Sequence, residues 1–252
     1  MSGEAAAVPF APALLRAPST AADRYEAKTA AEGNPLDHLR ALRSRGGVIA
    51  FPTESSYGLG ADPSSPDGVA AVERIKRRID RHAGPDAETA LSRKALPVVV
   101  ADLAQLAALG IDPESERVRL LAPFWPAPLS AVLPLAEGFE LPAASGERTL
   151  AVRIPAHAEL RALLAAIGPL TATSANRTGD PPLLRAPEVA ELLAEAGGID
   201  FAVVEGVAPG GPPSTLVAFD DADRIRILRQ GPFPAERLQG LSASSSSSRG
   251  EA

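Results

Sequence analysis

The densest cluster of reactive groups in this 252-residue chain is the stretch GGVIAFPTESSYGLG, at residues 46–60. The apolar residues 48–51 are typical of a strand covered on both faces, and Pro52 ends it because proline lacks an amide donor. Hydroxyls follow at positions 53, 55, 56 and 57, and glycines at 58 and 60 leave room for a ligand beside the backbone. On composition alone, an ordinary turn explains the stretch equally well, since these residue types are common in turns.

Other hydroxyl groups also follow predicted strands. A strand over residues 169–172 ends in Thr173-Ser174-Ala175-Asn176, and a third turn carries Ser214 and Thr215. Open α/β sheets bind ligands beyond the carboxyl ends of their strands. The loops at 53–57 and 173–176 therefore predict one shared crevice.

The cationic side chains have two alternative roles. Lys76 and Arg78 end a predicted helix, where cations are favoured even without a ligand. Arg153 lies in an apolar strand, so it needs an anionic partner, which is either a substrate carboxylate or an internal Asp or Glu. Together, four cations would neutralise much of a triphosphate, with Ser174 and Asn176 adding hydrogen bonds and Mg²⁺ arriving on the phosphates: Lys76, Arg78, Lys94 and Arg229.

Composition excludes several classes of site. A net charge of −6 argues against a broadly basic, nucleic-acid-binding surface, and the absence of cysteine excludes disulfides and thiolate zinc sites. With three histidines and no HExxH pattern, we expect no metal site made by the protein alone. Neither GxxxxGK[ST] nor GxGxxG is present, so a nucleotide would need a different cradle. Without a membrane-length apolar run or a signal-peptide pattern, we expect a cytoplasmic protein.

The order of predicted elements indicates an α/β fold. We expect a disordered extension at 1–33, one domain at 34–235 and a disordered serine-rich tail at 236–252. Asn34 and Ser65 are predicted to cap helices that Pro35 and Pro66 open, and Asp102 and Asp112 to cap two more. Further helices are predicted at 160–167 and 187–196, and strands at 48–51, 98–100, 131–135, 149–154, 169–172, 201–204, 215–219 and 224–228. Trp125 is predicted to be a core residue.

Eight segments, in order, resemble the YrdC-like threonylcarbamoyl-adenylate synthases, which modify tRNA. They are PTESSYGLG (52–60), IKRR (75–78), KALPVVV (94–100), FWPAPLS (124–130), LAVRIP (150–155), TATSANRTG (171–179), PSTLV (213–217) and ILRQGP (227–232). The ordered set is more specific than any one motif. The resemblance implies a single α/β domain in which a twisted mixed sheet, flanked by helices, forms a concave ligand crevice.

The resemblance also implies an activity. The enzyme would be a nucleotidyltransferase that joins L-threonine, bicarbonate and ATP into threonylcarbamoyl-adenylate and releases pyrophosphate, for the t⁶A modification of tRNA. Lys76 and Arg78, on the family's KxR motif, would be the catalytic cations. The residues expected around threonine are Ser55, Thr149, Arg153 and Ser214, and those expected around ATP are Arg78, Lys94, Ser174, Asn176, Pro182 and Arg229.

The sequence departs from the family at three places. Ser55 replaces a usual threonine, Ala127 replaces a usual glycine, and residues 79–93 form a longer polar segment that predicts a mobile surface loop. Three alternatives stay open: a paralogue that binds nucleotide without making this product, a carbamoyl-transfer domain with another acceptor, and an RNA-binding module without catalysis. Expected partners are a downstream tRNA threonylcarbamoyl transferase and, weakly or transiently, double-stranded RNA, but no membrane.

Overall fold

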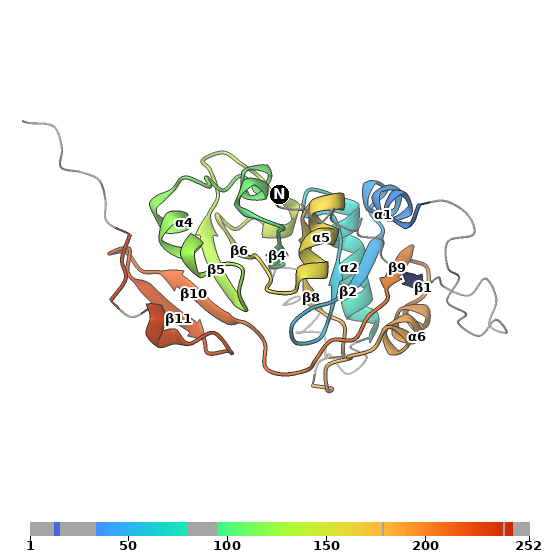
Figure 1. The fold of residues 1–252 in the computed structure, drawn as a ribbon. Coiled ribbons are helices and arrows are strands. Elements are labelled where there is room, and N and C mark those ends of the chain that lie inside the picture. Colours follow the sequence, from blue (N-terminus) through green and yellow to red (C-terminus); the bar gives the residue numbers. More distant parts are fainter. Residues whose placement is uncertain (1–12, 16–33, 80–94, 178, 239, 244–252) are drawn as a thin grey trace, which may run out of the picture.

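The computed structural model describes residues 13–15, 34–79, 95–177, 179–238 and 240–243 (Figure 1). The segment 80–94, including most of the predicted loop and Lys94, lies outside the described residues. The elements in chain order are β1 (Leu14–Leu15), α1 (Pro35–Ser44), β2 (Val48–Pro52), β3 (Tyr57–Gly60), α2 (Pro66–Ile79), β4 (Val98–Val99), η1 (Leu103–Leu109), α4 (Glu116–Leu121), η2 (Ala122–Phe124), β5 (Leu129–Pro134), η3 (Pro142–Ala144), β6 (Thr149–Arg153), α5 (Ala158–Ile167), β7 (Leu170–Thr171), β8 (Thr173–Ser174), α6 (Ala186–Ala196), β9 (Phe201–Val204), β10 (Thr215–Phe219), β11 (Ile225–Arg229) and η4 (Ala235–Leu238).

The helix starts test the predicted caps. The Asn34 side chain accepts a hydrogen bond from the Leu36 amide at 3.0 Å, and Pro35 opens α1, as predicted. The Asp102 side chain caps η1. The prediction for Asp112 is wrong: α4 begins four residues later at Glu116. The Asp112 carboxylate instead accepts from the Glu114 amide in a local turn, which competes with helix capping.

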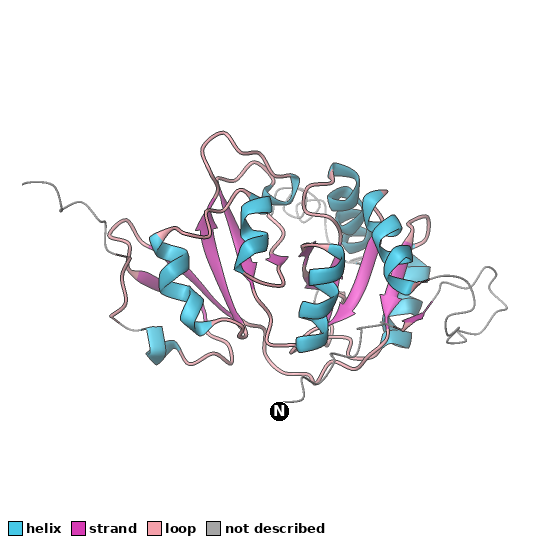
Figure 2. Ribbon diagram, turned by 45° about the horizontal axis from the view of Figure 1, so that its top comes forward, coloured by secondary structure: helices cyan, strands magenta, loops and turns pink. Residues whose placement is uncertain are grey.

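The five-stranded sheet has the order β1-β9-β2-β3-β8 and is covered on both faces. Along β2, Ile49 and Phe51 pack with helices α1 and α5, whereas Val48 and Ala50 pack with α2 and α6. Figure 2 shows these helices on opposite sides of the strands. This double cover explains why the sequence of β2 is apolar without alternation.

The six-stranded sheet has the order β11-β10-β5-β6-β4-β7 and packs its largest core against one face, while on the other face Val99 of β4 and Leu170 of β7 pack with α5. Leu129, Ala131 and Leu133 of β5 point into that core, together with alternate residues of β6 and β10. Trp125 belongs to the same core, as predicted from the sequence. Its indole donates a hydrogen bond to the Leu129 carbonyl. The intervening residues of β5, β6 and β10 face away from the core and leave that part of the second face available for a ligand.

One extended segment joins the two sheets. β7 pairs with β4 in the six-stranded sheet, and β8 pairs with β3 in the five-stranded sheet, with only Ala172 between them. The Thr171 amide also donates to the Ala61 carbonyl, just beyond β3. Gly60 permits this close approach, because a Cβ atom there would lie 2.3 Å from the Thr171 carbonyl oxygen. The mixed α/β architecture agrees with the predicted fold class, as two sheets joined by this segment.

Described residues outside the predicted domain bounds of 34–235 also pair or pack with the rest of the fold. β1 lies within the segment 1–33, which the sequence predicts to be disordered, and pairs antiparallel with β9. Packing also continues beyond the predicted boundary at residue 235, since Leu238 and Ala243 are buried. In the part of the chain that is described, no helix combines the length and apolar character needed to cross a bilayer.

Candidate functional site

A cavity of about 470 Å³ lies where the two sheets meet. The open face of the six-stranded sheet provides one wall, and the loop after β2, the start of β3, β8 and helix α2 provide the other. All three hydroxyl-bearing loops reach this cavity, as the sequence predicted for the first two. The predicted site residues that line it are Ser55, Lys76, Arg153, Ser174, Ser214 and Arg229.

In the hydroxyl loop between β2 and β3, some hydroxyl groups stabilise the local fold and others line the cavity. The Thr53 hydroxyl donates to the Ser56 carbonyl at 2.7 Å and accepts from the amides of Ser55 and Ser56, which closes the turn. The buried Tyr57 hydroxyl donates to the carbonyls of Val204 and Gly206, and burial followed by the nearby Glu205 charge raises its pKa. The Ser55 hydroxyl lies 3.5 Å from the Thr53 hydroxyl, and both Ser55 and Ser56 line the cavity.

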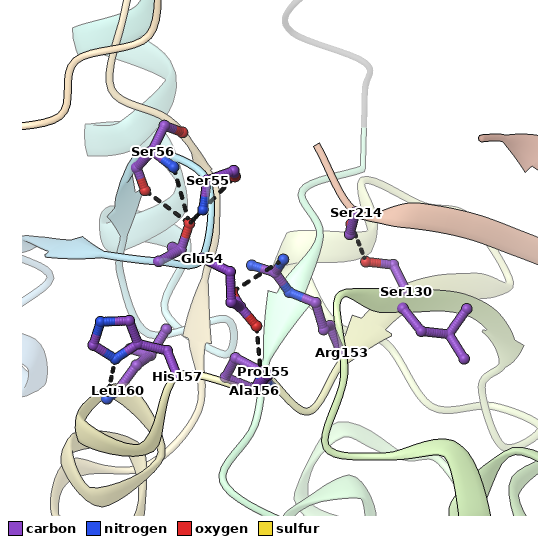
Figure 3. A network of polar contacts seen from close by, with 12 residues as sticks. Glu54, Ser55, Ser56, Ser130, Arg153, Pro155, Ala156, His157, Leu160 and Ser214 are labelled. Carbon is purple, nitrogen blue, oxygen red and sulfur yellow. Dashed lines mark hydrogen bonds and ion pairs between the residues drawn. The ribbon is translucent and has the colours of Figure 1, made fainter. Parts of the chain in front are cut away.

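Arg153 faces the cavity from β6 and is almost fully buried. Its Nη1 lies 3.4 Å from Oε2 of Glu54 in the hydroxyl loop, and Glu54 Oε1 accepts from the Ala156 amide at 2.5 Å (Figure 3). Burial lowers the pKa of the Arg153 guanidinium, the Glu54 charge opposes that shift, and the positive charge of Arg229 adds to it. An internal partner thus contacts Arg153, the alternative that the sequence left open beside a substrate carboxylate.

A second polar group lines the six-stranded side. The hydroxyls of Ser130 and Ser214 lie 2.8 Å apart, and both side chains are buried (Figure 3). The Arg229 guanidinium donates to the Ser214 carbonyl from Nε at 3.1 Å and from Nη2 at 2.9 Å. These bonds fix the end of β11 against the turn before β10, so two guanidinium groups share one cavity.

Lys76 occupies the opposite wall, in the last turn of α2. Its Nζ donates to the carbonyls of Asn176 at 2.6 Å and Ser174 at 3.3 Å. The Asn176 side chain donates to the Asp180 carbonyl at 2.8 Å, while its Oδ1 is buried without a hydrogen-bond partner in the described structure. The ammonium group therefore fixes the loop after β8 against the last turn of α2.

Four of the predicted residues that the structure describes do not line the cavity: Arg78, Thr149, Asn176 and Pro182. Arg78 donates from Nη1 to the carbonyls of Ala196 and Gly197, which caps the C-terminus of α6. Thr149 begins β6, is exposed, and stands about 13 Å along the strand from Arg153. Pro182 is exposed on the loop before α6, and Lys94 lies outside the described residues. Thr149 is thus the member of the predicted threonine set that the cavity does not include.

Sequence reasoning missed Glu54 and Ser130. Glu54 stands inside the first motif, and the unpaired arginine expected in β6 was the signal that an internal carboxylate was needed. Ser130 could be found only from the register of β5, where it alternates with the core residues Leu129 and Ala131. Among the described residues, no group of three or more His, Asp or Glu side chains gathers to hold a metal ion.

Comparisons with known proteins place the chain in a structural context. A family model described as Telomere recombination, covering Sua5, yciO and yrdC, matches residues 41–231. The crystal structure of P. abyssi Sua5 complexed with L-threonine is 28% identical, with a TM-score of 0.67, and the match covers 84% of this chain and 60% of that one. A doubly substituted P. abyssi Sua5 is 29% identical, with a TM-score of 0.65 and coverages of 81% and 58%.

The crystal structure of E. coli YciO is 21% identical, with a TM-score of 0.63, and the match covers 81% of this chain and 92% of that one, which supports the fold alone. The chain spans about three fifths of the length of the Sua5 structures that it matches.

Proposed function

The chain belongs to the Sua5/YciO/YrdC family, and from this premise we propose that it is an L-threonylcarbamoyladenylate synthase. It would join L-threonine, bicarbonate and ATP and release pyrophosphate, as a nucleotidyltransferase in the t⁶A modification of tRNA. Sua5, the relative solved with L-threonine, supports the choice of amino acid.

The observation that carries the proposal is one cavity with two differently equipped walls. On the six-stranded side, Arg153, Ser130 and Ser214 offer a cation and two hydroxyls, a set suited to an amino-acid carboxylate. On the other side, Lys76 and Ser174 face the space that a phosphate chain would take. The volume of about 470 Å³ lies within the range of small-molecule sites, about 300–1,000 Å³.

The reaction needs no covalent enzyme intermediate. The threonine amine takes up the carbon of bicarbonate, which forms a C–N bond and releases water. A carbamate oxygen then attacks the α-phosphorus of ATP, the bond from that phosphorus to the β-phosphate oxygen breaks, and pyrophosphate leaves. Negative charge accumulates on the phosphoryl oxygens, and fixed cations such as Lys76 and Arg229 would stabilise it.

The proposed ATP site extends beyond the cavity lining. We assign Arg78 to the ATP phosphates through its Nε and Nη2 atoms. Among the described residues, only its Nη1 makes hydrogen bonds, so the other two nitrogen atoms can donate to a ligand. The buried Oδ1 of Asn176 would gain a partner from ATP or from its hydration shell. Mg²⁺ would arrive with the nucleotide rather than in a protein site. The tRNA and the downstream transferase are further expectations of the same proposal.

The decisive experiment measures pyrophosphate release by the purified protein with ATP, Mg²⁺, L-threonine and labelled bicarbonate. We expect release to depend on both threonine and bicarbonate, with the label recovered in an adenylate. ATP binding without this dependence would favour a nucleotide-binding paralogue. Dependence on a different amine would favour a carbamoyl-transfer activity.

A further inference from the structure

The carboxylate of Glu54 joins the two walls of the cavity without lining it. The residue belongs to the hydroxyl loop of the five-stranded sheet, yet both carboxylate oxygens face the six-stranded side (Figure 3). Oε1 accepts from the Ala156 amide, just after β6, and Oε2 lies 3.4 Å from Arg153 Nη1. Oε2 is buried and accepts no hydrogen bond within the described structure.

The Glu54 carboxylate compensates the positive charge of the buried Arg153 guanidinium. Arg153 is buried on an open sheet face, and Arg229 contributes a second positive charge nearby. A buried guanidinium without a counter-ion is strongly disfavoured and would move toward water or away from Arg229. The Glu54 charge, 3.4 Å from Nη1, attracts the guanidinium toward the hydroxyl loop without taking a hydrogen bond from it, so its N–H groups can still be directed at a ligand.

We propose that Glu54 is a positioning residue that aims the Arg153 guanidinium at the carboxylate of the amino-acid substrate and links that contact to the hydroxyl loop bearing Ser55. The inference rests on the proposed function for the identity of the substrate. Glu54 does not itself touch the substrate, because it does not line the cavity. It acts through Arg153 and through the shape of the loop.

Glu54→Gln tests this with little change of shape, because the amide oxygen still accepts from Ala156 while the charge is lost. We expect the KM for L-threonine to rise about 10-fold to 100-fold, the scale of a charge-assisted hydrogen bond, with a smaller change in kcat and in the KM for ATP. In an Arg153→Met background, Glu54→Gln should raise the KM for L-threonine no further. An unchanged KM, or an equal increase in both backgrounds, would overturn the proposal.

The matched control is Asp223→Asn, which removes the carboxylate from an ion pair with Arg117 outside the cavity. It should lower stability without changing the KM for L-threonine. If Glu54→Gln does not fold, Glu54→Asp is measured instead, since withdrawing the charge by one methylene should also raise that KM, and an unchanged value would overturn the proposal.

A second measurement separates this inference from the proposed function. In ¹⁵N-arginine NMR spectra of the ligand-free protein, rotation of the Arg153 guanidinium should be slow in wild type and faster in Glu54→Gln. If wild type shows no threonine-dependent reaction, the proposed function fails, while this change in rotation would still support Glu54 as the group that holds Arg153. Identical Arg153 signals in the two proteins would overturn it.

Discussion

The two sheets contribute to the cavity in different ways. The five-stranded sheet is covered by helices on both faces, so only the ends of its strands and the loops that follow reach the ligand space. The six-stranded sheet leaves one face of β5, β6 and β10 uncovered, and side chains such as Ser130, Ala151 and Arg153 reach the cavity from the middle and ends of these strands. The five-stranded sheet therefore contributes loops to the cavity, whereas the six-stranded sheet contributes side chains from its open face.

The cations of the two sides are also partnered differently. Lys76 donates to the carbonyls of Ser174 and Asn176, which orient the ammonium group beside the end of β8. Arg153 lies beside a carboxylate, which compensates its charge and leaves mainly directional hydrogen bonds. An ammonium group meets a phosphate chain as a point charge, whereas a planar guanidinium suits a single carboxylate through directional hydrogen bonds.

Arg153→Met should give the largest effect and sharpen this comparison. We expect the KM for L-threonine to rise about 100-fold, near the upper end for hydrogen bonds to charged groups, with little change in the KM for ATP. Steady-state kinetics with each substrate varied in turn provides the measurement. Because the substitution leaves the Glu54 carboxylate without its cation, the Glu54→Gln/Arg153→Met protein serves as the folded control. Equal increases in both KM values would break the division between the walls.

Arg78→Ala should affect the other substrate. If Arg78 contacts phosphates, ATP binding weakens by about 1.5–3 kcal/mol, as for a charge-assisted hydrogen bond. Calorimetry measures the affinity. The variant should also lose stability, since Arg78 caps α6, and denaturant unfolding separates the two effects. Unchanged ATP affinity in a stably folded variant would show that capping is its whole role.

Ser55→Thr tests an assignment that does not follow the division between the two walls of the cavity. Ser55 belongs to the five-stranded side but is assigned to the amino acid, and it lacks the methyl group of the usual family threonine. Restoring the methyl should lower the KM for L-threonine several-fold, corresponding to about 1 kcal/mol for one buried carbon. An increase in KM would mean that the cavity has no room beside this loop.

The smallest effect is expected at the far edge of the six-stranded sheet. Asp220 accepts from the Arg224 and Ala222 amides, and the hydrogen bond from the Arg224 backbone is the main cause of its lowered pKa. Since the folded pKa is below the unfolded one, this carboxylate stabilises the protein above the unfolded pKa, and the contribution is lost as pH falls through the folded pKa. Asp220→Asn should therefore flatten the stability profile slightly below about pH 4, as urea unfolding at several pH values would detect. An identical pH profile would contradict this.

Sequence patterns predicted the parts of the site that depend on neighbouring residues. The loop at 53–57 follows a visibly buried strand, and Arg153 stands out as a charge in an apolar run. Ser130 looks unremarkable until β5 is placed in register, because its partner Ser214 is far away in the chain. Arg78 shows a different limit: a cation at a helix end has the same local pattern whether it binds a phosphate or another helix, and only the position of α6 distinguishes the two.

The segment from Leu170 to Ser174 has a further consequence, for folding cooperativity. Because its first half belongs to one sheet and its second half to the other, neither sheet can lose this strand without disturbing its neighbour. The tryptophan of the chain lies in the core of the six-stranded sheet, so its fluorescence reports directly on that half alone. Far-ultraviolet circular dichroism also reports on the helices that cover the other sheet. The two signals should follow the same denaturation curve, with both halves unfolding as one unit.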